Sequence, residues 1–272
     1  MKIKMTSSLT RPLDMDYSDN RLIILLCAVV FVASAFFRIV PGDHPVQGIV
    51  WGGRAALSIF FAWALAKEID PDNPGSAITA SAIGITGLLY FNSSGLLAAL
   101  FLLFLLRMVN RTVGVPLTLS DSILIMLIGI YLAYTGEWMY AIVMSIAFLM
   151  DATLKEPVRR HFPYAVISLI AGLLSIYDNG IETKFISGHI FALLLLVLFF
   201  ISRILLAGKS NYLSDRSGQR LSSQRITAAC IVALATGLLA ITEGSTTIIE
   251  IFPLWAAMGG TVAFDIMQRM KP

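Results

Sequence analysis

Three carboxylates and two prolines form the sharpest polar cluster of the chain. Glu68, Asp70 and Asp72 follow directly after a long apolar run. Pro71 and Pro74 lie among them and stop a helix from continuing. Mg²⁺ prefers oxygen ligands, commonly one or two carboxylates together with substrate phosphates. Asp70 and Asp72 are therefore candidate metal ligands beside a lipid pyrophosphate, and the simpler alternative is a solvated turn at a helix end.

Charged side chains at the ends of other apolar runs extend this candidate polar cluster. Arg107 and Arg111 could clamp phosphates through paired guanidinium hydrogen bonds. Asp151, Arg203 and Asp265 lie in the same third of their own runs. We expect Asp151 to pair with Arg107, and Asp265 to pair with Arg203. Such pairs would offset desolvation and fix which helices pack together, so the cluster also has a purely structural interpretation.

Arg54 is a separate candidate ligand contact, near the opposite end of its apolar run from the acidic cluster. It follows Gly52 and Gly53 and lies about a turn and a half into its apolar run. Ionisable residues inside a span are expensive to bury and are functional candidates by default. No carboxylate lies near the middle of any run, which counts against a proton-coupled transporter.

The composition indicates that these residues are held in a lipid environment. The chain has 272 residues, of which 57% are hydrophobic and 14% are charged, and its mean hydropathy is +0.80. Soluble domains carry about 25% charged residues. Cys27 and Cys230 both lie inside apolar runs and indicate no disulfide framework or zinc site. The basic loop Lys209–Arg225 has no interleaved aromatic residue beyond Tyr212, so we expect no nucleic-acid partner.

Ten apolar segments must position the charged residues. We predict an all-α, polytopic transmembrane bundle of about ten spans, arranged as five helical hairpins of the same orientation. A span needs about 20 residues, so the third, fifth and seventh segments are short. The predicted spans are residues 22–40, 48–68, 76–91, 95–112, 121–135, 138–156, 163–177, 187–207, 225–242 and 252–270.

The distribution of basic residues predicts the orientation. All but three of the 20 Lys and Arg residues fall on one side of the predicted bundle, the exceptions being Arg38, Arg54 and Lys184. The positive-inside rule then places both termini and the loop 208–224 in the cytoplasm of a cell membrane. We predict a cytoplasmic tail over residues 1–20 and a single transmembrane domain over 21–272. The basic loop is expected to contact anionic lipids, and the bilayer is the other expected partner.

An internal repeat accompanies the hairpins. The segments SIFFAWALAKEIDPDNP, SIAFLMDATLKEP and GGTVAFDIMQRMKP each run from small apolar residues through an acid to a proline. Similarity at a regular period predicts stacked units, here in parallel orientation. Separately, Ser187-Gly188-His189 resembles part of the signature of phosphatidic-acid-type lipid phosphatases, but Ile186 replaces its proline and the flanking motifs are missing. No family is assigned.

Three functions remain open from the sequence, and it names neither a substrate nor a reaction. The favoured one is a transporter of a small solute or lipid, an interpretation based on span number and repeats. A polar cavity lined by Arg54, Thr79, Ser81, Thr86 and Ser145 would favour it. The alternatives are a lipid-modifying enzyme with a cytoplasmic-side acidic and arginine site, and a membrane scaffold with closed Asp–Arg pairs. We expect no cofactor, except Mg²⁺ in the enzyme alternative.

Overall fold

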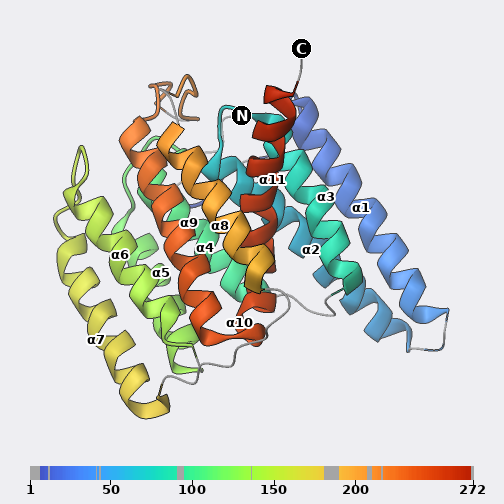
Figure 1. Cartoon of the computed structure of the whole chain (residues 1–272), viewed down its shortest axis with the longest axis horizontal. Coiled ribbons are helices and arrows are strands. Elements are labelled where there is room, and N and C mark those ends of the chain that lie inside the picture. Colours follow the sequence, from blue (N-terminus) through green and yellow to red (C-terminus); the bar gives the residue numbers. More distant parts are fainter. Residues whose placement is uncertain are drawn as a thin grey trace. The chain divides into compact units, whose positions relative to one another are not determined.

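The computed structural model describes residues 7–11, 13–40, 42, 44–90, 95–135, 137–180, 190–206, 210–215 and 217–270. Within these residues the regular elements are all helices, and an isolated antiparallel β-bridge pairs Leu213 with Arg220. Eleven helices occur in this part of the chain (Figure 1). They are α1 (Ser18–Ile39), α2 (Pro45–Ile69), α3 (Pro74–Tyr90), α4 (Leu96–Asn110), α5 (Leu119–Tyr134), α6 (Met139–Thr153), α7 (His161–Asn179), α8 (Ile190–Leu206), α9 (Ser223–Glu243), α10 (Ser245–Glu250) and α11 (Phe252–Arg269).

Helix length and composition together separate four candidate spans from the other helices that the structure describes. Each predicted apolar segment contains a helix, and α10 is an additional short one. By length and composition, α1, α2, α7 and α9 can cross a membrane. The other apolar helices include α5, whose 16 residues extend only about 24 Å, less than the roughly 30 Å of a hydrocarbon core. The all-helical class is therefore confirmed, whereas the ten-span hairpin bundle stays a prediction.

Local chemistry fixes where several helices begin. Pro45 opens α2 at a position where the missing N–H has no intrahelical partner, and His44 Nδ1 accepts a hydrogen bond from the Val46 N–H at 3.4 Å. Thr118 caps α5, because its hydroxyl oxygen accepts from the Asp121 N–H at 3.2 Å. These caps set the register of the side chains that follow in each first turn.

The chain divides into two compact units. Unit 1 consists of Met1–Arg11 and Phe101–Ile248, and unit 2 consists of Pro12–Leu100 and Ile249–Pro272. The predicted single transmembrane domain over residues 21–272 stays a prediction.

In unit 2, α2 contacts α1, α3 and α11, and α3 also contacts α11. Glycines allow the backbones to approach closely. A Cβ atom added to Gly52 would lie 2.6 Å from the Phe31 carbonyl oxygen of α1. A Cβ atom on Gly260 would lie 2.4 Å from the Ala80 nitrogen of α3. Close packing of this kind stabilises helix pairs in lipid, where no hydrophobic drive brings helices together.

In unit 1, α6 is the interior helix and contacts α5, α7 and α9. Its Tyr140 and Phe148 side chains are fully buried, and the Tyr140 ring packs edge-on against Phe101 with centroids 6.0 Å apart. A Cβ atom on Gly129 of α5 would lie 2.4 Å from the Met144 sulfur of α6. The tight packing carries Asp151, in the last turn of α6, into a closed environment.

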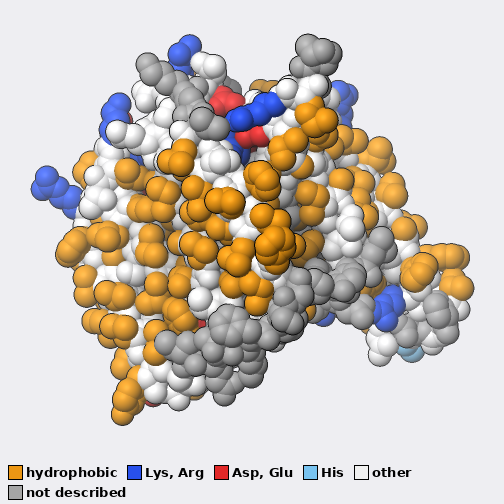
Figure 2. All heavy atoms as spheres, in the orientation of Figure 1, with side chains coloured by type: hydrophobic (Ala, Val, Ile, Leu, Met, Phe, Trp, Pro, Cys, Tyr) orange, Lys and Arg blue, Asp and Glu red, His pale blue; other side chains and the backbone are white. Residues whose placement is uncertain are grey.

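The outward faces of several helices are apolar. α7 exposes Val166, Ile170 and Leu173, and α1 exposes Val32 and Phe36. Figure 2 shows hydrophobic side chains along the helices of unit 1, with Lys and Arg side chains toward their ends. Contiguous apolar surfaces of this extent are unusual on soluble monomers and suit contact with lipid.

Candidate functional site

Asp151 is the centre of a buried ionic cluster in unit 1. Only 1% of its surface is exposed. Its Oδ1 accepts hydrogen bonds from Arg111 Nη2 at 2.9 Å and from Arg225 Nη1 at 2.7 Å. Its Oδ2 lies 2.8 Å from His161 Nδ1. The expected pairing of Asp151 with Arg107 is wrong, because helix packing presents Arg111 and Arg225 to the carboxylate instead.

Arg225, in the first turn of α9, joins three segments of unit 1. Besides Asp151, its guanidinium donates to the carbonyl oxygens of Val109 at 2.9 Å and Lys155 at 2.6 Å, with a longer bond of 3.4 Å to Glu156. The Val109 carbonyl lies at the C-terminal end of α4, where a helix leaves its last carbonyls without intrahelical donors, and the Lys155 and Glu156 carbonyls lie in the turn after α6. Arg225 Nε also donates to the Lys155 carbonyl oxygen at 3.2 Å, so every N–H of the guanidinium is used inside the protein, and we assign Arg225 a structural role.

Two residues around the cluster adopt left-handed backbone conformations. Arg111 has φ 55° and Glu156 has φ 58°, an uncommon conformation for residues other than glycine. Arg111 Nη2 also donates to the Glu156 carbonyl oxygen at 2.9 Å. Hydrogen bonds to the buried cluster compensate for the unfavourable backbone geometry of both turns.

A chain of hydrogen bonds continues from Asp151 to α5. His161 is fully buried, and its Nε2 lies 2.8 Å from the Ser122 hydroxyl oxygen. The Ser122 hydroxyl also lies 2.9 Å from the Thr118 carbonyl oxygen. The order Asp–His–Ser resembles that of a nucleophilic triad. Ser122 is itself 0% exposed, so no substrate reaches it, and the chain acts as a link between helices.

Arg107 contacts the N-terminal segment. Its Nη1 donates to the Leu9 carbonyl oxygen at 2.6 Å, and the Leu9 side chain is buried. The Ser8 N–H and hydroxyl both donate to Asp121 Oδ2, at 3.0 and 2.8 Å. Arg11 Nε forms an ion pair with Asp215 Oδ2 at 2.6 Å. Part of the predicted cytoplasmic tail therefore packs onto unit 1.

The acidic cluster lies in unit 2. Glu68 and Asp70 are buried at the end of α2, and Asp72 is exposed. The Asn73 amide donates to both Asp70 oxygens, at 2.9 and 3.2 Å. Among the residues that the structure describes, no group of three or more His, Cys, Asp or Glu side chains could hold a metal ion. A two-carboxylate magnesium site at Asp70 and Asp72 stays a prediction.

The remaining candidates are dispersed. Arg54 is exposed on α2. Arg203, in the last turn of α8, and Asp265, in α11, are half-buried and belong to different units, so their pairing stays a prediction. The motif at Ser187-Gly188-His189 lies outside the described residues.

Several hydroxyl groups are candidates for lining a polar cavity. In the structure they donate hydrogen bonds to backbone carbonyl oxygens. Thr79 donates to the Gly75 carbonyl oxygen at 2.9 Å, and Thr86 donates to Ala82 at 3.2 Å. Ser81 and Ser145 likewise donate to backbone carbonyl oxygens, of Ala77 at 3.0 Å and of Ala165 at 2.8 Å. These bonds occupy each hydroxyl's single proton.

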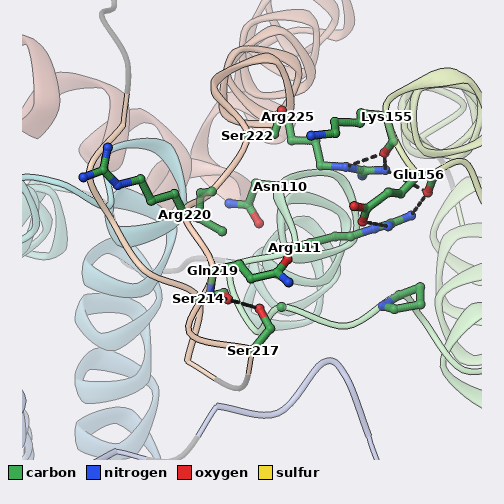
Figure 3. A pocket seen from close by; sticks show the side chains of 13 residues that line it. Asn110, Arg111, Lys155, Glu156, Ser214, Ser217, Gln219, Arg220, Ser222 and Arg225 are labelled. Atoms are coloured by element: carbon green, nitrogen blue, oxygen red, sulfur yellow. Dashed lines mark hydrogen bonds and ion pairs between the residues drawn. The ribbon is translucent and has the colours of Figure 1, made fainter.

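A polar pocket of about 110 Å³ lies beside the Asp151 cluster, in unit 1 (Figure 3). It is formed by the turn after α4, the turn after α6 and the segment that leads into α9. Four cationic side chains line it, against one carboxylate, that of Glu156. The cations are Arg111, Lys155, Arg220 and Arg225, and neutral polar lining residues include Asn110, Ser214, Ser217, Gln219 and Ser222.

Sequence reasoning identifies Arg111 and Asp151 and expects the loop 208–224 to contact anionic lipids, but it misses His161 and Arg225 as members of the site. In the sequence, Arg225 is only one of many basic residues at helix ends. The feature that could have indicated Arg225 is its position on the same predicted side as the ends of two other apolar runs. This feature identifies a contact only when the packing of the helices is known.

Comparison of the chain with protein-family models, curated proteins and solved structures finds no match. The site is therefore interpreted from its own chemistry.

Proposed function

We propose that the chain is a multi-pass protein of the cell membrane, with both termini in the cytoplasm, that binds an anionic ligand at the pocket of unit 1. Four candidate spans and the apolar outward faces support the membrane assignment. The excess of Lys and Arg on one predicted side supports the orientation. The ten-span arrangement in five hairpins is part of this proposal.

The lining of the pocket carries the ligand assignment. The pocket is lined by four cationic side chains and a single carboxylate, and serine hydroxyls supply further donors. The cations are Arg111, Lys155, Arg220 and Arg225. Clustered guanidinium and ammonium groups attract phosphates and carboxylates and hydrogen-bond to their oxygens. A volume of about 110 Å³ suits one anionic group rather than a whole lipid. The ligand is therefore a lipid headgroup or a small solute that places its anionic group there.

We further propose transport of this ligand as the use of the site. A pocket at the predicted cytoplasmic ends of the helices is where a transporter would release or take up its solute. Uptake of a labelled anion into proteoliposomes would support transport. In the enzyme alternative, stabilisation by Mg²⁺ would be lost in the double variant Asp70→Asn/Asp72→Asn.

Thermal unfolding of the detergent-purified chain tests the anion site. Sulfate or methyl phosphate should raise Tm above the value in chloride at equal ionic strength, because a ligand that binds only the native state stabilises it. The double variant Lys155→Gln/Arg220→Gln should lose most of this shift. Both side chains are exposed, so we expect the variant to fold.

Arg269→Gln is the matched control, since Arg269 is an exposed arginine of unit 2 outside the pocket. It should keep the full anion-dependent shift. An equal shift in the double variant and the control, or no shift in the unaltered chain, would contradict the proposed site.

A further inference from the structure

The charges of the pocket are unevenly neutralised. Asp151 is the buried partner of both Arg111 and Arg225. Glu156 Oε2 lies 3.8 Å from Arg111 Nη1. Two carboxylates thus offset two guanidinium groups, and two further lining cations, Lys155 and Arg220, remain.

Lys155 and Arg220 have no ion pair within the described part of the chain, and both are exposed. Figure 3 shows them on different sides of the pocket, with the Arg220 guanidinium extending away from Arg111. An exposed arginine reorients by side-chain rotation within nanoseconds, so Arg220 can turn toward a ligand. The pocket therefore offers two uncompensated positive charges.

Donors in the pocket fit the same kind of ligand. Arg225 has no N–H left, whereas Arg111 Nη1 makes no hydrogen bond to any described residue and faces only the exposed Glu156 carboxylate. The Ser214 and Ser217 hydroxyls bond to each other, and at most one proton serves that bond. Arg111 Nη1 and the second hydroxyl proton of the Ser214–Ser217 pair are therefore available as donors to a group with several acceptor oxygens.

We infer that the ligand group of this pocket is a doubly charged phosphate monoester, rather than a singly charged diester or carboxylate. This inference rests on the proposed anion site and specifies its ligand class. A phosphate monoester carries close to two negative charges above pH 7 and has three terminal oxygens that accept hydrogen bonds. A phosphodiester headgroup carries only one charge and would leave one of the two cations unmatched.

The test compares methyl phosphate with dimethyl phosphate by titration calorimetry of the full chain in detergent at pH 8. Methyl phosphate is mainly a dianion at this pH, and Lys and Arg keep their charge. Methyl phosphate should bind about fivefold tighter or more, the factor expected of one additional charge about 4 Å from a cation in water. In Lys155→Gln the preference should fall, and in Lys155→Gln/Arg220→Gln it should approach one, whereas Arg269→Gln should retain it.

The outcomes separate this inference from the proposed function. Equal affinity for the two esters would overturn the monoester assignment and leave the anion site standing. Binding of neither ester would overturn both. A preference for methyl phosphate that Lys155→Gln leaves unchanged would place the discrimination outside this pocket and would also overturn the inference.

Competition with lipid vesicles identifies the source of the monoester. Displacement of methyl phosphate by phosphatidic acid, a monoester, but not by phosphatidylglycerol, a diester, supports a lipid headgroup. No displacement by either lipid supports a soluble phosphorylated solute. Equal displacement by both lipids would contradict the monoester preference.

Discussion

At the residue scale, one carboxylate organises the ends of several helices. Asp151 of α6 holds Arg111 after α4, Arg225 of α9 and His161 of α7, and all of these contacts lie away from solvent. Buried charges are tolerated when they are paired and hydrogen-bonded. The cluster therefore sets which helix ends meet, and it supports the pocket formed by the adjacent turns.

Replacing Asp151 tests the cluster. Asp151→Leu leaves two buried guanidinium groups without their carboxylate and should lower the free energy of unfolding by about 3–5 kcal/mol. Asp151→Leu/Arg111→Met should cost less than the sum of the two single changes. Denaturant unfolding in micelles measures all four proteins of this cycle, and additive effects would refute the coupling.

Ser122 offers a smaller change in the same network. Ser122→Ala removes the partner of His161 Nε2 and should lower the free energy of unfolding by about 1–3 kcal/mol, the cost of an unsatisfied buried polar group. Ser120→Ala serves as the control, because Ser120 is exposed in the same turn. A similar loss in both variants would argue against a role for the His161 contact.

At the scale of elements, small residues decide how closely helices pack. Gly260 of α11 lies against the α3 backbone at Ala80, whereas a Cβ atom added to Gly53 of α2 would meet no neighbouring atom within 4 Å. Both glycines occur in apolar helices, so the sequence alone does not show which of them lies against another helix. The difference arises from which face of the helix meets a neighbour.

Gly260→Val should therefore disrupt α3–α11 packing. The new side chain would overlap backbone atoms, which cannot rotate away, so we expect destabilisation of about 1–3 kcal/mol or more. Gly53→Ala should have no such effect, and its better helix propensity should stabilise α2 by up to about 1 kcal/mol. Equal losses from both substitutions in micellar unfolding would contradict this packing.

At the scale of the whole molecule, charge distribution predicts the topology. The segment 210–222 follows the predicted cytoplasmic end of α8, and Asp178 lies near the end of α7 that we place outside. Labelling of single cysteines tests this, with Cys27 and Cys230 replaced by alanine. A membrane-impermeant maleimide should label Asp178→Cys in intact cells, and Gly218→Cys only after permeabilisation. The reverse pattern would invert the proposed orientation.

The sequence by itself determines that this chain is helical, and its apolar runs predict a lipid environment. Its apolar runs contain few polar side chains. In a hydrocarbon environment the backbone N–H and C=O groups of each run must hydrogen-bond within the run, and this favours helices. All ten predicted runs contain a helix. Charged residues in these runs lie mostly near the ends, and for this reason the sequence alone indicates Arg111 and Asp151 as candidates.

Only the tertiary structure decides which charges meet. Arg107 and Arg111 lie four residues apart, and the sequence favours Arg107 as the partner of Asp151 and Arg111 as a phosphate contact. In the packed structure Arg107 donates to the Leu9 carbonyl oxygen, and Arg111 donates to the Asp151 carboxylate. Arg225 arrives from a segment 74 residues beyond Asp151. Which charged side chains pair depends on how each helix is rotated and on the path of the connecting turns. Neither can be read from the spacing of residues along the chain.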